Sequence, residues 1–278
     1  MTADTHASLR TKIGEISERH GCEAVGVSVH DFADGSDFSH HGEEWFHAAS
    51  TIKVVLLLAL YKAAENGSVR LDDRLHVRNR FRSIVDGSPY RIGGDRDGDS
   101  LVHRHIGRSM KLTDLAHAMI TRSSNLATNL LLEFIGLENI QRTLHEAGLD
   151  ELKLVRGVED QPAYDKGLNN EATANGLVKF FRLLREEGVL SQTTREQMLA
   201  ILLAQEFNSM IPARLPRTAQ VAHKTGEIST HCHDAGLVIL PERPPYALAI
   251  LTKSPAKADQ RSKVVAEISE AIYAHLTA

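Results

Sequence analysis

Cysteine, aromatic residues and long apolar runs are all scarce in this chain of 278 residues. Its two cysteines, Cys22 and Cys232, are too few for the disulfide framework of a small secreted scaffold, and we expect two free thiols. The most apolar run, residues 54–60, is far shorter than the roughly 20 residues of a membrane-spanning helix. The first residues lack the basic and apolar stretches of a signal peptide. The sequence as written therefore predicts a cytoplasmic protein without a membrane segment, or a periplasmic or secreted one if a signal peptide has been removed.

An excess of positive charge is also absent. The 32 lysines and arginines are outnumbered by 36 acidic residues, which gives a formal net charge of −4. Nucleic-acid binders usually carry a basic stripe, so we expect no nucleic-acid partner. The shares of hydrophobic residues (42%) and charged residues (24%) are those of a globular protein and exclude disorder. We therefore expect a small-molecule substrate, and the composition specifies no oligomeric state.

Hydrophobic periodicity divides the chain into helices and strands. A first helix over residues 5–19 has Leu9, Ile13 and Ile16 on one face, and Asp34 and Gly35 mark a hairpin turn. Further helices are predicted over 50–66, 112–123, 127–135, 138–146, 172–187, 193–205 and 263–276. Strands are predicted over 24–30, 36–43, 221–223, 237–240 and 246–252, an irregular segment over 78–108, and a polar loop over 155–171.

This order of elements predicts an α/β (α+β) fold with an antiparallel sheet. Strands from the two ends of the chain join in that sheet, the terminal helices pack on it, and the middle helices form an all-helical lobe. We expect a single catalytic domain over residues 1–278. Its α/β lobe covers about 1–50 and 215–278 and its helical lobe about 51–214, and a cleft between two lobes is a usual place for a site.

Three short motifs carry the chemistry. Ser50 and Lys53 are one turn apart at the start of an apolar helix, so their side chains share a face. The free N–H groups of a helix start favour developing negative charge, and a desolvated lysine can accept a proton from a serine. The other two motifs are the triplet Ser-Ser-Asn at 123–125 and Lys-Thr-Gly at 224–226. Each motif alone is common as a helix cap, a surface charge or a strand end.

Together, the three motifs resemble the penicillin-recognising serine hydrolases, which include class A β-lactamases and penicillin-binding proteins. The sequence around each of the first two motifs, over 46–54 and 119–132, is also similar to that of the class A enzymes. The resemblance implies a β-lactamase/transpeptidase-like fold and hydrolysis of β-lactam amides through an acyl-serine intermediate. Ser50 would attack the lactam carbonyl, Lys53 would accept its proton, and Ser123 would pass a proton to the leaving nitrogen. No cofactor is implied.

The resemblance also implies how the substrate is bound. Asn125 would bind the acylamido side chain and orient Lys53, whereas Lys224 and Thr225 would contact the substrate carboxylate. Gly226 would let the strand run close to the ligand. The oxyanion hole would consist of the backbone N–H groups of Ser50 and Glu227, and the loss of one such donor typically costs about 10²–10³ in rate.

The loop that should release the acyl group departs from the class A pattern. Class A enzymes carry Glu-x-x-x-Asn there, with the glutamate activating water, and residues 155–173 contain no such pair. Four acids are candidates, in the order Asp165, Glu159, Asp160 and Glu171. The alternative is that all four are solvated and the acyl group is released slowly. The machinery would then belong to a covalent β-lactam binder. A separate alternative, favoured by the absence of a signal peptide in the sequence as written, is an esterase, amidase or peptidase that acts on a cytosolic metabolite.

The third motif departs from the pattern as well. Glu227 stands where a small or hydroxyl residue is usual and could repel an anionic substrate. We find no nearby arginine for the substrate carboxylate, so a protonated His231 or His233 could replace it, unless both are simply exposed hairpin residues. These two histidines have no second ligand cluster, and the loop at 93–99 lacks the spacing of a calcium loop. We therefore expect no metal site and a solvated loop at 93–99.

Overall fold

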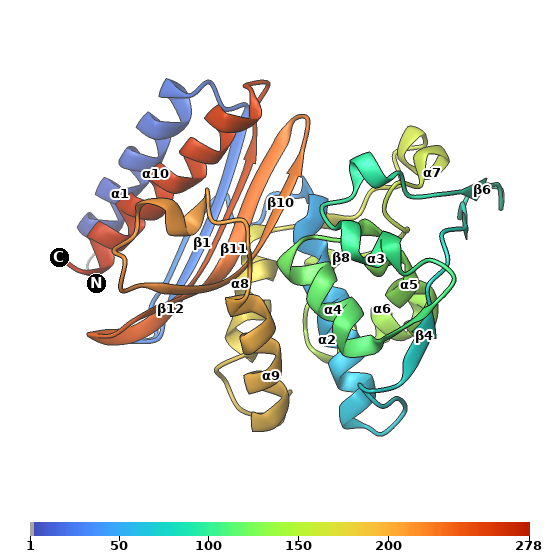
Figure 1. The fold of residues 1–278 in the computed structure, drawn as a ribbon. Helices are drawn as coiled ribbons and strands as arrows, with labels where there is room; N and C mark the ends of the chain where they lie inside the picture. Colours follow the sequence, from blue (N-terminus) through green and yellow to red (C-terminus); the bar gives the residue numbers. More distant parts are fainter. Residues whose placement is uncertain (1–2) are drawn as a thin grey trace.

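The computed structural model describes residues 3–278. The terminal helices α1 (Ala3–Arg19) and α10 (Ala258–Leu276) lie side by side on one face of a central sheet (Figure 1). Helix α8 (Ala174–Leu183), which we expected in the helical lobe, packs against the sheet strands β1 and β12. The remaining helices form the helical lobe: α2 (Lys53–Glu65), α3 (Ser100–Arg104), α4 (Leu112–Thr121), α5 (Asn125–Ile135), α6 (Leu137–Glu146), α7 (Gln161–Asp165) and α9 (Gln192–Leu203).

The central sheet has five antiparallel strands in the order β10-β11-β12-β1-β2. They are β1 (Ala24–Asp31), β2 (Asp37–His40), β10 (Gln220–Ile228), β11 (His231–Leu240) and β12 (Arg243–Lys253). The two ends of the chain meet where β1 pairs with β12, for example at Val27 and Ile250. The predicted sheet and its terminal helices are therefore confirmed.

Short elements connect the sheet to the helical lobe. Three small sheets contain β3 (Phe46–His47) with β8 (Leu152–Lys153) and β9 (Glu171–Ala172), β4 (Arg74–His76) with β7 (Ser109–Lys111), and β5 (Phe81–Arg82) with β6 (Pro89–Tyr90). Three 3₁₀ helices are η1 (Ala49–Ile52), η2 (Gly94–Arg96) and η3 (Ile211–Arg214). The first two of these lie at the site described below.

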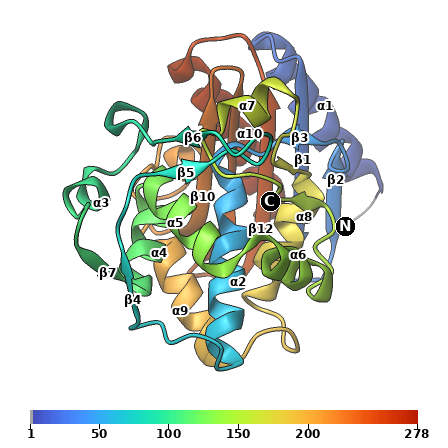
Figure 2. The ribbon, with the colours of Figure 1, turned by 90° about the vertical axis from the view of Figure 1, so that its right-hand side faces the viewer.

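Two apolar clusters stabilise the fold. In β12, Leu248 and Ile250 belong to the cluster beneath α1 and α10, and Ala247 and Ala249 to the cluster shared with the helical lobe. This is the alternation of faces that a strand requires. Residues 53–61 of α2 are all buried, and the helix runs through the middle of its lobe with α4, α5 and α6 around it (Figure 2). A helix that is apolar on every side belongs in such a position.

Several predicted boundaries were wrong for local reasons. The helix predicted over 112–123 ends at Thr121, because Ser123 has a left-handed φ of 57°. The segments 155–171 and 78–108, predicted to be irregular, contain α7, β9, β5, β6, η2 and α3. Strands β10 and β11 extend well beyond 221–223 and 237–240. The added positions hold polar residues such as Lys224 and Asp234, which interrupt the apolar pattern and yet are buried.

Both cysteines are free thiols, as predicted, with Cys232 buried and Cys22 half-buried. Burial raises the pKa of Cys232 to about 12, so this thiol is protonated at neutral pH. None of the helices in the described part of the chain has the length and apolar character to cross a membrane.

Candidate active site

A cleft of about 430 Å³ is lined by residues of η1, α5, β10 and the loop that leads into α7. Three of the residues singled out by the motifs line it: Ser50, Asn125 and Glu227. A larger, more open groove of about 890 Å³ lies between α2, α4 and α9, but it contains none of the motif residues. The smaller cleft is therefore the candidate active site.

Ser50 follows a backbone turn that is stabilised by its neighbours. Ala49, just before it, has a φ of 47°, a left-handed conformation that is unfavourable for a residue with a Cβ atom. The Ala49 N–H donates to Nδ1 of His47 at 3.1 Å, and the Ala48 N–H donates to the Asn170 carbonyl at 2.8 Å. Burial and the nearby Arg156 lower the pKa of His47, which keeps Nδ1 available as an acceptor. No motif in the sequence pointed to His47.

Lys53 is fully buried at the start of α2, and its amine reaches the second motif. Its Nζ lies 2.6 Å from the Ser123 carbonyl oxygen, 2.8 Å from Asn125 Oδ1 and 3.1 Å from Ser123 Oγ. Within residues 3–278, the partners of this amine belong to the second motif, and no hydrogen bond joins it to the Ser50 hydroxyl.

The environment of Lys53 favours its neutral form. Burial and the positive charge of Lys224 hold the pKa of Lys53 well below its usual range. The Lys53 amine donates to the Ser123 carbonyl, to Ser123 Oγ and to Asn125 Oδ1, and none of these partners carries a charge. The lowered pKa favours the amine with a lone pair, which is the form that can accept a proton.

The second motif is a strained turn followed by a capped helix. Ser123 has a φ of 57°, and Ser124 caps α5 by accepting a hydrogen bond from the Ala127 N–H at 3.2 Å. The side-chain amide of Asn125 donates through Nδ2 to the Arg96 carbonyl at 2.9 Å. Because Nδ2 is used in this way, Oδ1 of Asn125 faces Lys53.

The third motif comes from the sheet and meets the second. Lys224 is fully buried on β10, and its Nζ donates to Ser123 Oγ at 3.1 Å and to the Thr225 carbonyl at 2.8 Å. Burial lowers the pKa of Lys224 to about 7, against the opposing effect of Asp234. The amines of two lysines, one before Ser123 in the chain and one after it, therefore contact the same Ser123 hydroxyl.

Gly226 allows β10 to pass directly along the start of the nucleophile helix. A Cβ atom at this position would lie 2.9 Å from the Ser50 nitrogen and 2.8 Å from the Thr51 nitrogen, which is too close for any side chain. The next residue, Glu227, lines the cleft. The end of β10 therefore lies directly against the backbone of η1, and Ser50 and Glu227 line the same cleft.

Glu227 is neutralised by an arginine that sequence analysis missed. Arg261 of α10 donates to Glu227 Oε1 at 2.8 Å, and also to the carbonyl oxygens of Ser229 and Ile228. Its position in the final helix, 34 residues from Glu227, gave no local signal. The ion pair reduces the repulsion that we expected between Glu227 and an anionic substrate.

The two hairpin histidines do not have the role that we considered. His233 is fully buried, accepts a hydrogen bond from the Thr252 N–H at 3.1 Å and bonds the His47 carbonyl at 3.0 Å. Burial lowers the pKa of His233 to about 3 and that of His231 to about 4. Both are neutral at pH 7, so a protonated histidine does not replace a carboxylate-binding arginine here, and His233 is not exposed.

The structure separates the four acidic candidates of the loop. Glu159 and Asp160 line the cleft, whereas Asp165 is exposed on α7 outside its lining, with Gln161 donating to it at 2.6 Å. Glu171 pairs with Lys153 at 3.6 Å on the small sheet.

The two cleft acids differ in what their oxygens contact. Asp160 is fully buried and caps α7, since its oxygens accept the N–H groups of Ile84 and Ala163. The Glu159 carboxylate forms an ion pair with Arg96 at 3.1 Å. Glu159 is therefore the candidate with a carboxylate at the cleft that is not used to cap a helix.

The loop at 93–99 is solvated only in part, with residues 94–96 exposed. The side chains of Asp97 and Asp99 are buried, and both accept hydrogen bonds from backbone N–H groups. Within residues 3–278, no group of three or more histidine, cysteine or acidic side chains is arranged to hold a metal ion.

This chain is similar to known proteins over nearly its whole length. Residues 8–276 match the model of the β-lactamase enzyme family. A β-lactamase of Proteus vulgaris is 22% identical over 283 residues, covering 98% of this chain and 88% of that protein.

Two solved structures are similar over nearly the whole chain. A variant of the last common ancestor of Gram-negative class A β-lactamases is 28% identical with a TM-score of 0.85, covering 97% of this chain and 98% of that one. A mutant of PBP-A, solved as an acyl-enzyme complex with penicillin G, is 25% identical with a TM-score of 0.82, covering 98% and 97%. The chain belongs to the β-lactamase enzyme family.

Proposed function

We propose that this protein is a serine hydrolase of the class A β-lactamase type, which opens β-lactam amides through an acyl intermediate on Ser50. The observation that carries the proposal is the convergence of Lys53 and Lys224 on the Ser123 hydroxyl, each at 3.1 Å, next to the cleft that contains Ser50. The PBP-A mutant with bound penicillin G supports the same chemistry for a related fold.

Acylation begins when the Ser50 hydroxyl attacks the lactam carbonyl. The neutral amine of Lys53 accepts the serine proton, and the C–N bond of the lactam breaks as Ser123 delivers a proton to the nitrogen. Ser123 is reprotonated through the two lysines that contact it. The negative charge on the carbonyl oxygen is stabilised by the N–H groups of Ser50 and Glu227. The close approach of Gly226, the residue before Glu227, to the Ser50 nitrogen supports this pairing.

Substrate binding uses the residues around this centre. Asn125 lines the cleft and binds the acylamido side chain, while Lys224 and Thr225 bind the substrate carboxylate. Because Arg261 neutralises Glu227, the charge available to attract an anion at this end of the cleft is that of Lys224.

The KM of a β-lactam with a free carboxylate should rise by about tenfold as the pH is raised through about 7. The pKa of Lys224 is about 7, so its ammonium group is charged below that pH and neutral above it. A hydrogen bond to a charged group contributes about 1.5–3 kcal/mol, and its loss accounts for the change. KM for benzylpenicillin and for its uncharged methyl ester would be measured from pH 6 to 9. An equal rise for the ester would contradict the role of Lys224.

Glu159 activates the water that releases the acyl group. We expect Glu159→Gln to slow release of the acyl-enzyme by about 10²–10⁴, the usual contribution of a general base. Asp165→Asn should leave the release rate unchanged, because Asp165 lies outside the lining of the cleft. Intact-mass spectra taken after benzylpenicillin is diluted out give both rates. If Asp165→Asn slows release of the acyl group and Glu159→Gln does not, then Asp165 and not Glu159 activates the water.

A covalent binder with slow turnover is the second candidate. The ion pair between Glu159 and Arg96 favours it, since a paired carboxylate is a weaker base for water. An esterase, amidase or peptidase with the same machinery is the third.

Nitrocefin and benzylpenicillin distinguish the three candidates when absorbance and intact mass are followed together. Rapid turnover, seen as a change in absorbance, without an adduct supports the hydrolase, and a persistent adduct on Ser50 supports the binder. If neither compound reacts while Ser50 still reacts with a fluorophosphonate, the chain acts on a different ester or amide.

A further inference from the structure

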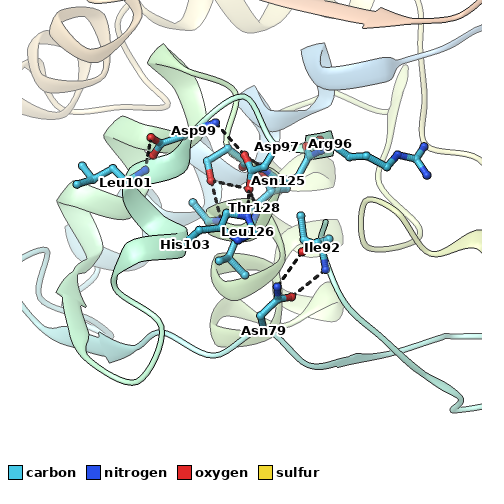
Figure 3. Close-up of polar contacts among 12 residues, drawn as sticks. Asn79, Ile92, Arg96, Asp97, Asp99, Leu101, His103, Asn125, Leu126 and Thr128 are labelled. Atoms are coloured by element: carbon cyan, nitrogen blue, oxygen red, sulfur yellow. Dashed lines mark hydrogen bonds and ion pairs between the residues drawn. The ribbon is translucent and has the colours of Figure 1, made fainter. Parts of the chain in front are cut away.

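The carboxylate of Asp97 is the centre of a buried network beside the second motif. Its side chain has no exposed surface. Oδ1 accepts the N–H groups of Asn125 at 3.0 Å and Asp99 at 3.1 Å. Oδ2 accepts the Leu126 N–H at 2.9 Å, His103 Nε2 at 3.0 Å and the Ser124 hydroxyl at 3.3 Å (Figure 3). Five donors surround one carboxylate, which leaves no oxygen free for a cation.

These contacts fix the residues that follow Ser123. The N–H groups of Asn125 and Leu126 open α5 and have no acceptor within the helix, and a negative charge at a helix start is favourable. The carbonyl of Arg96, adjacent to Asp97 in the chain, accepts Nδ2 of Asn125 and so turns Oδ1 toward Lys53. The network therefore specifies where the partners of Lys53 lie.

We propose that Asp97 is a positioning residue of this active site: its buried carboxylate holds the Ser123–Asn125 turn against Lys53 and supplies a negative charge near that amine. The inference rests on the proposed roles of Ser50 and Lys53, but it does not depend on which acyl substrate is used. Asp97 does not touch the reacting atoms and acts through Asn125 and Lys53.

The charge of Asp97 matters because the direct partners of Lys53 are neutral. Ser123 and Asn125 contact its amine, while Asp97 and Glu159 are the acids that raise its pKa against burial and Lys224.

Other charged groups near Asp97 have partners of their own. Arg96 pairs with Glu159, and Arg122 pairs with Asp99 at 3.1 Å. The side chain of His103 is the ionisable partner that contacts the Asp97 carboxylate directly.

Asp97→Asn tests both parts of the inference, with Asp99→Asn as the matched control. Asp99 lies in the same loop and is also buried, but it caps α3 and pairs with Arg122 and does not contact the second motif. The rate of covalent labelling of Ser50 by a fluorophosphonate, which forms an O–P bond and releases fluoride, would be measured from pH 5 to 9. Benzylpenicillin acylation would be measured in parallel, and thermal unfolding would establish that each variant is folded.

We expect Asp97→Asn to lower both labelling rates by about 10²-fold, the usual cost of a small misplacement in an active site. Without the negative charge the pKa of Lys53 falls further, so the acid limb of the labelling profile shifts to lower pH. Asp99→Asn should keep the acid limb of the pH profile at the wild-type pH and most of the labelling rate. The inference would be overturned if Asp97→Asn showed the wild-type labelling rate and acid limb, or if Asp99→Asn lost as much labelling rate as Asp97→Asn.

A second variant covers the case in which Asp97→Asn does not fold. His103→Phe removes one donor to Asp97 from a partly exposed position, and we expect a labelling rate several-fold below wild type. An unchanged rate in His103→Phe would then overturn the inference. If the wild-type protein is labelled by the fluorophosphonate but not acylated by any β-lactam, the proposed substrate class is wrong and the role of Asp97 is still measured.

Discussion

Replacing Ser50 with alanine is expected to abolish the covalent adduct with benzylpenicillin and to lower hydrolysis by about 10⁴-fold or more. The nucleophile is the one group whose removal eliminates the acyl-enzyme route altogether, and the residual rate then comes from binding and the oxyanion hole. The N–H groups of η1 and the buried lysines remain in place in this variant. The fold should therefore be unchanged, and intact mass measured after incubation with the β-lactam reports the result.

Ser262→Ala is the matched control, because Ser262 is on α10, away from the cleft lining, and its hydroxyl donates to the Asp259 carbonyl. It should form the adduct as fast as the wild type. An adduct of the expected mass on Ser50→Ala would mean that another residue is the nucleophile. Peptide mapping of that adduct would then identify the residue.

Replacing Lys53 with methionine should slow acylation by about 10²–10⁴ and remove the acid limb of its pH profile. The amine accepts the Ser50 proton in the proposed mechanism, and a general base typically contributes a factor of this size. Methionine has a similar shape but no nitrogen, so the Ser123 carbonyl and Asn125 Oδ1 lose their donor. Stopped-flow measurement of nitrocefin acylation from pH 5 to 9 gives both quantities.

Lys62→Met, on the same helix, is the control for this variant. Lys62 is partly exposed and pairs with Glu65 at 2.8 Å, outside the cleft. Its replacement should leave acylation at the wild-type rate and pH dependence. If Lys53→Met acylates as fast as Lys62→Met across the pH range, another group accepts the serine proton.

The coarse fold could be predicted because apolar periodicity records which faces are buried. Leu9, Ile13 and Ile16 indicated the face of α1, and these residues lie in the cluster beneath the terminal helices. The chain was less predictable where polar side chains enter the interior. Lys224 and His233 broke the pattern of β10 and β11, because their burial depends on hydrogen-bond partners that are distant in the sequence.

In the candidate site too, some residues could be predicted from the sequence and others could not. The motifs identified Ser50, Lys53 and Lys224 as chemical groups, since each has a residue type and spacing that the reaction needs. His47, Asp97 and Arg261 gave no such signal. Each acts by contacting a backbone or side chain whose location depends on the folded chain.

The sequence by itself determined the family and the reaction type and predicted the two lobes and the reactive side chains, because short motifs and apolar spacing are local properties. Only the tertiary structure decided that the amines of Lys53 and Lys224 meet at the Ser123 hydroxyl. It also decided that Glu159 rather than Asp165 lines the cleft, and that the Asp97 carboxylate is buried among hydrogen-bond donors and not exposed to solvent. The reason is physical. The pKa of an amine and the usefulness of a carboxylate depend on burial and on neighbouring charges, and both are set by residues far apart in the chain.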